Sequence, residues 1–296
     1  MCEFCHEHGE GKKWYLQMKN YSEELLHETL TPEQQKIVNA STRQEWNQNF
    51  FEWFVLPAIE NQPEPAQNEQ PKDHNTAPEE KLSASEELRR RKMTHFGQVI
   101  PIEDVEKVIE IADSITRFPC GCRYFNTGKS DKRYCFGLGK VVWGFNGQFP
   151  DAASGLEVLG KKEALKMIRD FDKEGLMHSI WTGVTPFIGG LCNCDRDCGA
   201  YRGYIENDGL PTFFHGEYIA QVNWDLCNGC KSCMRQCQFG AMFYSSILAK
   251  VHINETKCFG CGVCRVACHK KAIALIPRSE NPETADIWVK KGSYSR

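Results

Sequence analysis

The chain has 296 residues, enough for two or three domains that each bury a core. A formal net charge of −3 favours no class of partner, and the most apolar run, residues 50–59, contains Glu52 and is too short to span a membrane. The unusual feature is the presence of 16 cysteines. A secreted disulfide scaffold would need an export signal, and the charged start of the chain has no apolar stretch of that kind. We therefore expect a cytoplasmic protein whose thiols hold metals or clusters.

Residues 1–60 are predicted to form a helical amino-terminal segment. Thr31 and Pro32, followed by a glutamine, are typical of a capped helix start. The aromatic residues crowded into residues 46–59 indicate a buried helix face or, as the alternative, a surface that docks a partner. Residues 61–82 are rich in Pro, Asn, Gln and Glu and have almost nothing to bury, so we expect a disordered linker there.

A cysteine-rich middle domain is expected over residues 83–217. Apolar side chains recur at helical spacing over residues 102–115, which predicts an amphipathic helix. A second amphipathic helix is predicted over residues 161–175, with Gly175 suited to ending it. His178 follows this helix, where we expect a surface or capping residue.

Charge is divided unevenly between the two ends of the chain. Residues 1–88 carry 17 acidic and 7 basic side chains, whereas residues 222–278 carry 8 Lys or Arg and 2 Asp or Glu. Such an asymmetry steers an acidic partner to the carboxyl-terminal end, or brings opposite ends of neighbouring chains together. We therefore expect an acidic redox partner and consider a homo-oligomer.

The carboxyl-terminal region repeats one cysteine pattern. The stretch CNGCKSCMRQC, residues 227–237, returns as CFGCGVCRVAC, residues 258–268, so the two runs start 31 residues apart. Thiolates are soft ligands that suit iron–sulfur clusters, and three cysteines at every third position can wrap one corner of a cubane in a tight loop. Two zinc ribbons are the alternative, but zinc usually takes two C-x-x-C pairs separated by a longer loop.

These two runs resemble the bacterial two-[4Fe–4S] ferredoxin family over residues 218–278. The resemblance implies a ferredoxin-like fold in which the fourth cysteine of each run ligates the other cluster. The implied ligands are Cys227, Cys230, Cys233 and Cys268 for one cluster, and Cys258, Cys261, Cys264 and Cys237 for the other. Gly229 and Gly260 suit loops that bring backbone N–H groups close to cluster sulfurs. The family usually has Pro after the fourth cysteine, whereas this chain has Gln238 and His269.

The remaining eight cysteines are sufficient for two further four-thiolate sites. They are Cys2, Cys5, Cys120, Cys122, Cys135, Cys192, Cys194 and Cys198. The middle-domain members form two close groups of three, each of which needs one more ligand, and Cys2 and Cys5 are candidates to supply it. We expect at least one further cluster or a zinc in the middle domain. The alternative is that some of these thiols are simply reduced, buried side chains.

The stretch CEFCH at residues 2–6 also has the C-x-x-C-H spacing of haem attachment. Covalent haem is normally attached outside the cytoplasm, and we find no export signal. A zinc or cluster role with His6 or His8, or an end without any ligand, is therefore the stronger interpretation.

Together these patterns predict an α+β chain with a helical amino-terminal segment, a cysteine-rich α+β middle domain, a two-cluster ferredoxin-like domain and a polar tail over residues 279–296. The predicted function is single-electron transfer through two [4Fe–4S] clusters and at least one further centre, in an anaerobic host. One alternative is a redox enzyme, or a subunit of one, with a substrate site at a middle-domain cluster. A metal-dependent regulator is another alternative. We assign no catalytic residue, and we expect neither a membrane span nor nucleic-acid binding.

Overall fold

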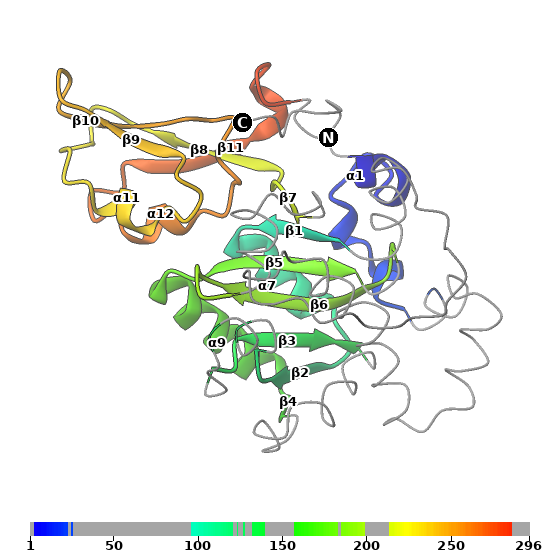
Figure 1. Cartoon of the computed structure of the whole chain (residues 1–296). Coiled ribbons are helices and arrows are strands. Elements are labelled where there is room, and N and C mark those ends of the chain that lie inside the picture. The colour runs from blue at the N-terminus through cyan, green and yellow to red at the C-terminus, as the bar shows by residue number, and fades with distance from the viewer. Residues whose placement is uncertain are drawn as a thin grey trace, which may run out of the picture.

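The computed structural model of the chain describes residues 3–22, 25, 96–120, 123, 127, 132–139, 157–182, 185–198 and 213–285. The expectations for Cys2, Cys122, the helix start at Thr31 and the linker at residues 61–82 concern residues outside these ranges. Figure 1 shows a larger part, built on one sheet with two helices, and a smaller carboxyl-terminal part of short strands and helices beside it. The described chain is therefore a mixture of helix and strand, as the sequence predicts.

Seven of the described strands form one sheet in the order β4-β2-β3-β6-β5-β1-β7. Their bounds are β1 Gly97–Ile100, β2 Ile115–Phe118, β3 Cys135–Leu138, β4 Glu157–Leu159, β5 Met177–Thr182, β6 Ile188–Cys194 and β7 Phe213–Phe214. β1 and β7 pair in parallel, and the other neighbouring strands are antiparallel. Pairs such as β1 with β5 join segments that are far apart in the sequence, so the sheet ties the middle of the chain into one unit.

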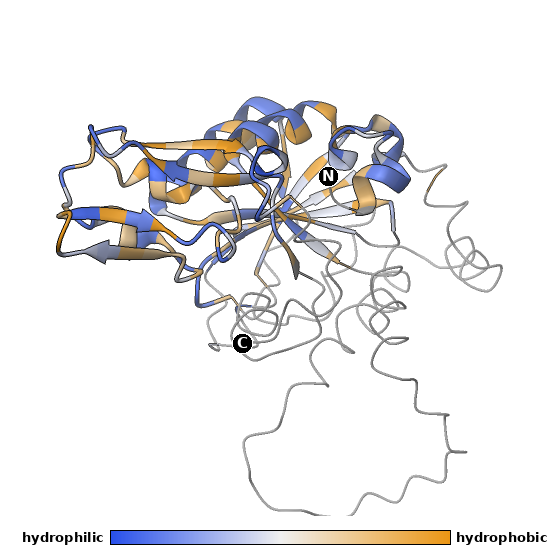
Figure 2. Cartoon of the chain, turned by 90° about the horizontal axis from the view of Figure 1, so that it is seen from above, coloured by the Kyte–Doolittle hydropathy of each residue, from blue (hydrophilic) through white to orange (hydrophobic). Residues whose placement is uncertain are grey.

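Two helices, α7 (Ile102–Ile111) and α9 (Lys161–Glu174), contact each other and share a core with one face of the sheet. α9 ends at Gly175, whose φ of 91° is the left-handed conformation that glycine adopts readily, as predicted. In Figure 2 both polar and apolar residues colour the helices, as expected of helices with one buried face. None of the helices in the described ranges is long and apolar enough to cross a membrane.

The two faces of the sheet bury different sets of side chains. Because side chains alternate along a strand, Ile180 of β5 and Leu191 of β6 point toward the helices, while their neighbours Trp181 and Cys192 belong to the other face. This other face contacts the carboxyl-terminal part, since Trp181 shares an apolar cluster with Phe259. The sheet therefore separates a helix-covered core from a face that meets the repeated cysteine runs.

Two sequence expectations in this part are wrong. The helix predicted over residues 102–115 ends at Ile111, and Ile115 is the first residue of β2. Both are packed against the same core, so apolar residues at helical spacing continue past the end of the helix. His178 is not a surface residue, because it lies fully buried in β5 with its Nδ1 2.6 Å from Asn193 Oδ1.

Residues near the amino terminus belong to the same core. They form α1 (Glu3–His8) and two short 3₁₀ helices, η1 (Trp14–Leu16) and η2 (Met18–Tyr21). Phe4 stacks on Phe96 with ring centroids 3.9 Å apart. The fully buried Asp104 of α7 accepts hydrogen bonds from Lys13 Nζ and Tyr15 Oη, both at 2.8 Å. These contacts fix the amino-terminal residues against α7.

The carboxyl-terminal part contains two small two-stranded sheets. β8 (Tyr218–Val222) pairs with β11 (Ile273–Pro277), and β9 (Met242–Ser245) pairs with β10 (Lys250–Ile253), both antiparallel. Two short helices, α11 (Ser232–Gln236) and α12 (Val263–Val266), follow the cysteine loops, and η7 (Arg278–Glu280) follows β11. A buried cluster that includes three cysteines lies between these elements.

The connection between the two parts is tightly packed. Gly216 donates its N–H to Phe259 O at 2.7 Å, and a Cβ at Gly216 would lie 2.8 Å from Val99 O. The buried guanidinium of Arg278 donates to Gly216 O at 2.8 Å and to Cys258 O at 2.5 Å. The carboxyl-terminal part is therefore anchored against β1 near the cysteine loop that starts at Cys258.

Candidate metal-cluster sites

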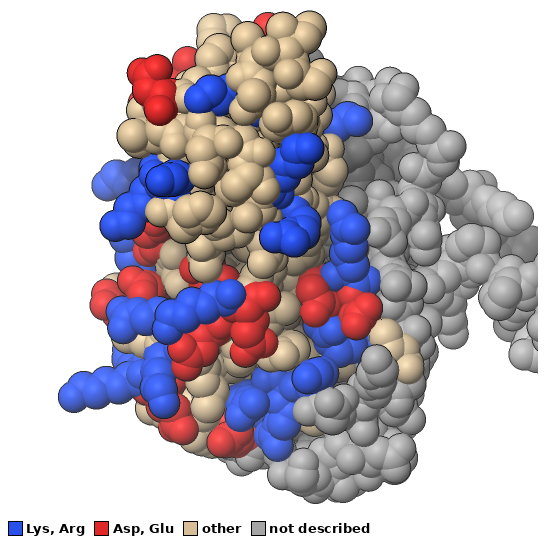
Figure 3. All heavy atoms as spheres, turned by 90° about the vertical axis from the view of Figure 1, so that its left-hand side faces the viewer, with Lys and Arg blue, Asp and Glu red and all other residues tan. Residues whose placement is uncertain are grey.

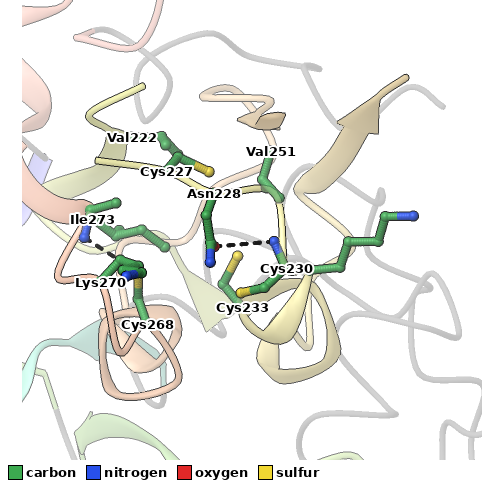
Figure 4. Close-up of a pocket in the computed structure, with 11 residues that line it drawn as sticks. Val222, Cys227, Asn228, Cys230, Cys233, Val251, Cys268, Lys270 and Ile273 are labelled. Carbon is green, nitrogen blue, oxygen red and sulfur yellow. Dashed lines mark hydrogen bonds between the residues drawn. The ribbon is translucent and has the colours of Figure 1, made fainter. Parts of the chain in front are cut away.

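The first candidate site is a hollow in the carboxyl-terminal part with about 330 Å³ of empty space, which includes space open to solvent. Four thiols line it, from Cys227, Cys230, Cys233 and Cys268. Figure 4 shows Cys227 and Cys230 on the loop that leads into α11, Cys233 in the first turn of α11, and Cys268 on the segment that follows α12. Lys231 and Lys270 also line the hollow. Three thiols of the first run thus meet the last thiol of the second run.

The second candidate site is a hollow of similar size, about 350 Å³. Four thiols also line this one, from Cys258, Cys261, Cys264 and Cys237. The rings of Phe239 and Phe259 form part of its wall and stack with centroids 4.2 Å apart. The two hollows therefore have the same number of thiols and nearly the same volume, and each takes three thiols from one run and one from the other.

The loops around these thiols depend on left-handed backbone. Gly229 and Gly260 occupy equivalent positions in the two runs with φ of 70° and 75°. Lys231 and Gly262 are also equivalent, with φ of 64° and 80°. These turns fold each loop back tightly enough for its cysteines to face one hollow. Backbone N–H groups approach the sulfurs as well, since Ala220 N lies 3.4 Å from Cys258 Sγ.

The thiols of the second hollow are more deeply buried than those of the first. At the first hollow Cys230 is exposed, and hydrogen bonding from Ser232 lowers the pKa of its thiol. At the second hollow burial raises the pKa of Cys261 to about 12 and raises the pKa of Cys264 well above its ordinary value. The first site thus opens to solvent, whereas the second is turned toward the rest of the molecule.

The residues present fit a [4Fe–4S] cluster at each hollow. Each cluster requires four thiolates, and each hollow is lined by four thiols. Much of the remaining lining is apolar, and backbone N–H groups of the loops are available to contact cluster sulfurs. Soft thiolate donors suit this cofactor.

A third set of thiols lies on the sheet face that points away from the helices. We call it the sheet thiol group, and its described members are Cys120, Cys135, Cys192, Cys194 and Cys198. Cys120 and Cys192 both hydrogen bond to Cys135, and this lowers the pKa of Cys135, while the same contact raises the pKa of Cys120. Cys194 contacts Cys192 and Cys198, with its Sγ 3.1 Å from Cys198 Sγ. The five thiols form one continuous chain of contacts.

A buried arginine lies beside the sheet thiol group. Arg123 interacts electrostatically with Cys120, Cys135 and Cys198, and its side chain is 4% exposed. Its guanidinium lies 2.7 Å from an Asp195 carboxylate oxygen, in the turn between Cys194 and Cys198. The sequence analysis did not single out Arg123. Its position directly after the CGC stretch could have indicated a positive charge beside the thiols.

Cys5, the other described cysteine, lies apart from these three sets. It is buried, and its Sγ is 3.4 Å from Glu217 Oε1. His6 is exposed, and His8 lies 3.4 Å from a carboxylate oxygen of Glu7. In the part of the chain that the structure describes, no group of three or more His, Cys, Asp or Glu side chains has the arrangement needed to hold a single metal ion. The metal role suggested for Cys5 therefore stays a prediction.

Two family models match the carboxyl-terminal part. Both describe a 4Fe-4S binding domain, one over residues 220–243 and the other over residues 255–271. Residues 220–271 therefore form a ferredoxin-like region that binds two [4Fe–4S] clusters, as the resemblance of the two runs implies. The rest of the chain is not assigned by these models.

Similar proteins match over short stretches. An archaeal glutamate synthase (NADPH) of Archaeoglobus fulgidus is 29% identical over 75 residues, which are 25% of this chain and 15% of that protein. An archaeal-type glutamate synthase (NADPH) of Thermotoga maritima is 34% identical over 59 residues, 20% of this chain and 12% of that protein. One subunit of an ion-translocating oxidoreductase complex of Methanosarcina acetivorans is 43% identical over 49 residues, 17% of this chain and 18% of that protein. The chain thus spans less than a fifth of the length of each of these relatives.

Proposed function

We propose that this chain is a redox protein that exchanges single electrons with a protein partner through its exposed carboxyl-terminal face. The observation that carries the proposal is the pair of four-thiol hollows, each built from both cysteine runs. Each bound cluster supplies reversible one-electron transfer. The proposal includes at least one further centre in the middle domain, a cytoplasmic location and an anaerobic host.

The residues around each hollow hold the cluster, set its reduction potential and determine how closely a partner can approach it. The thiolates of each hollow hold the cluster, and nearby backbone N–H groups together with burial set its potential. The open first hollow, with the exposed Cys230 and with Lys270 in its wall, suits approach by a partner. The second hollow, whose wall residues Phe239 and Phe259 pack against the sheet, suits exchange within the molecule.

The face around the first hollow has the composition of a docking surface for an acidic partner. Five of the eight large apolar side chains exposed in the described ranges belong to residues 224–248, namely Trp224, Leu226, Phe243, Ile247 and Leu248. Residues 222–278 carry 8 Lys or Arg and 2 Asp or Glu. In Figure 3 the upper part, which is the carboxyl-terminal region, shows mainly uncharged residues with scattered Lys and Arg. Exposed apolar side chains with scattered basic residues among them complement a partner surface that is apolar and acidic.

The relatives favour a role as a subunit or partner of a larger redox system. Their names describe a glutamate synthase (NADPH) and a subunit of an ion-translocating oxidoreductase complex. By analogy, we propose that this chain passes electrons to or from another protein that carries the substrate chemistry. A substrate site at a middle-domain centre is the second candidate, in which three cysteines hold the cluster and leave one iron free to bind a substrate.

The steering proposal is tested with oxidants of opposite charge. The reconstituted, reduced full-length protein is mixed anaerobically with less than one equivalent of ferricyanide or of hexaamminecobalt(III), which leaves the clusters intact, at rising ionic strength. Oxidation by the anion should slow as salt rises, because screening weakens attraction to the basic face, and oxidation by the cation should not slow. The variant Lys270→Glu should reduce the salt dependence of the rate of oxidation by ferricyanide. The control variant Lys166→Glu, on α9, should leave that salt dependence unchanged. A salt-independent rate with both oxidants would remove the steering argument.

A further inference from the structure

We propose that the sheet thiol group binds a third [4Fe–4S] cluster and that this site lies against the second ferredoxin-like hollow. The inference deepens the proposed function by assigning the further centre to particular residues and giving it a place beside one of the two hollows. It rests on the convergence of the five thiols, on the buried arginine and on the contacts that join the group to the carboxyl-terminal part.

The five thiols converge from four places in the fold. Cys120 lies just past the end of β2, where its Sγ accepts a hydrogen bond from Tyr134 N at 2.9 Å. Cys135 begins β3, and Cys192 and Cys194 lie two residues apart on β6 and so share one face. Cys198 returns onto Cys194 through a turn in which its N–H donates to Asp195 O at 3.0 Å. Separate elements thus place five sulfur atoms together.

Packing alone does not account for this arrangement. Free cysteines are often buried one at a time as small apolar side chains. Here four of the five are buried and the fifth is half-buried, and each thiol has another thiol as a neighbour. Thiols are weak hydrogen-bond donors and acceptors, so a buried chain of them contributes little stability. Soft ligands gathered in a protected place are the arrangement that a cluster requires.

Arg123 supplies a buried positive charge at the same place. Two aspartates compensate it in part, because Asp195 and Asp197 lie 2.7 and 3.7 Å from its guanidinium. Within the described ranges its Nε has no hydrogen-bond partner although it is buried. A buried donor without a partner is costly, and thiolates bound to iron are acceptors that would satisfy it. An uncharged set of thiols would leave that cost in place.

The spacing of the thiols along the chain favours an iron–sulfur cluster over a structural zinc ion. Four thiolates close a tetrahedral zinc site, and the ligands normally come as two C-x-x-C pairs. The sheet thiol group has five described members, and none of them forms a C-x-x-C pair. Cys135, Cys192 and Cys194 are its central members, because Cys135 and Cys194 each contact two thiols and Cys192 lies between them.

Two side chains join the group to the second hollow. Gln238, the residue after Cys237, donates from Nε2 to Cys194 O at 3.2 Å and to Gly175 O at 3.0 Å. In return Arg196 donates to the carbonyl oxygens of Cys237 and Gln238, both at 3.3 Å. A ligand of the second hollow is thus one residue away from a direct contact with the backbone of a sheet thiol.

An apolar layer fills the space between the same two sites. Cys194 and Cys198 share a buried cluster with Phe259, and Phe239 and Cys261 pack against it. Phe259, Phe239 and Cys261 also line the second hollow. This apolar cluster and the hydrogen bonds made by Gln238 and Arg196 place the third site beside the second hollow. The first hollow lies on the side with the exposed Cys230.

Iron counting in the full-length chain tests the assignment. After anaerobic reconstitution with iron and sulfide, the wild-type chain should hold about 12 irons, four for each of three clusters. The double variant Cys135→Ser, Cys192→Ser should hold about eight and should lose one set of [4Fe–4S] signals in Mössbauer spectra. The control Cys5→Ser removes a buried thiol outside the group and should keep the wild-type count.

The other possible iron counts contradict either the third cluster site or the proposed electron-transfer function. About eight irons in the wild-type chain, alone or with one zinc, would overturn the third site and leave the two ferredoxin-like clusters intact. A cystine between Cys194 and Cys198 in the anaerobic protein would do the same. Fewer than eight irons in every variant would contradict the proposed function itself. A wild-type count of about eight irons overturns the third site even where the double variant does not fold.

Discussion

At the scale of single residues, Gly260 shows how closely a cysteine loop must approach the neighbouring backbone. Its φ is 75°, and a Cβ there would lie 2.1 Å from Tyr218 O. We predict that Gly260→Ala lowers the free energy of unfolding by about 3 kcal/mol, because it adds left-handed strain and overpacking against a fixed carbonyl. Denaturant unfolding of the reconstituted protein measures the loss, and the cluster at the second hollow should be lost first.

Gly240 provides the matched control for this substitution. It has a similar φ of 63°, but nothing lies within 4 Å of the position that a Cβ would take. Gly240→Ala should therefore cost only the left-handed strain, about 1 kcal/mol. Equal losses in the two variants would show that the close approach to Tyr218 O does not limit the loop.

Gln238 is the residue that the ferredoxin family usually replaces with Pro, and the structure gives it a role. Its side chain donates hydrogen bonds to Gly175 O and Cys194 O across the contact between the two parts. We predict that Gln238→Ala lowers the free energy of unfolding by about 2 kcal/mol, because two carbonyl oxygens lose their donor. Amide hydrogen exchange should rise at the end of β6 and around Gly175.

Gln221 offers a comparison of the same residue type. It lies exposed on β8, so Gln221→Ala should change the free energy of unfolding by less than about 0.5 kcal/mol. If Gln238→Ala behaves like Gln221→Ala, the hydrogen bonds from Gln238 do not hold the two parts together. Iron content should stay the same in both variants, since neither residue is a proposed ligand.

At the scale of elements, an ion pair links the first turn of α7 to α12. Arg265 NH1 and NH2 lie 2.6 and 2.9 Å from the two carboxylate oxygens of Glu103. This hydrogen bonding holds the pKa of Glu103 below its ordinary value of 4.5. A lowered carboxyl pKa in the folded state stabilises the protein above the ordinary value, and the contribution is lost as pH falls through the folded-state value.

The predicted contribution is small because the Glu103 side chain is 52% exposed. At neutral pH, Glu103→Gln should lower the free energy of unfolding by about 0.5 kcal/mol. The difference between the wild type and this variant should shrink as pH falls below 4.5, and comparing them at each pH cancels any shared loss of clusters. Glu110→Gln, on the exposed side of the same helix, is the control, and a constant difference across this range would contradict the ion-pair account.

The sequence predicted local elements better than long-range pairing. α9 was predictable because its apolar spacing and its terminal glycine are local signals, and it spans Lys161–Glu174. The strand order β4-β2-β3-β6-β5-β1-β7 was not predictable, because neighbours such as β1 and β5 are far apart in the chain. β2 was missed because Ile115 continued the helical spacing of α7. Local patterns thus indicate the type of an element but not its partner.

For the candidate sites too, local sequence patterns were predictable and long-range contacts were not. The cysteines around the two hollows were predictable because their spacing matches a known pattern. The sheet thiol group could be suspected from its residues, but only the pairing of β3 with β6 brings Cys135 near Cys192. The link from Gln238 to Cys194 had no signal in the sequence except the missing proline.

At the scale of the whole molecule, the two parts are stabilised in different ways. The core between the sheet and α7 and α9 contains large apolar side chains such as Ile168 and Phe136. The carboxyl-terminal cluster is built from smaller residues, and three of its eight buried members, Cys233, Cys258 and Cys264, are proposed cluster ligands. Two-stranded sheets are only marginally stable by themselves. The carboxyl-terminal part therefore depends on its cofactors more than the sheet does.

Removing the iron should separate these two contributions. Oxidation of the reconstituted protein with ferricyanide in the presence of EDTA strips the clusters, and cluster binding is coupled to folding. We predict that amide hydrogen exchange then becomes fast throughout β8–β11 but stays slow in β1 and β5, because those strands keep the helix-covered core. Mass spectrometry of exchanged peptides, compared with the untreated protein, measures the difference. Slow exchange preserved in β8–β11 would mean that side-chain packing alone holds the ferredoxin-like region, whereas fast exchange in β1 and β5 would mean that the sheet depends on iron as well.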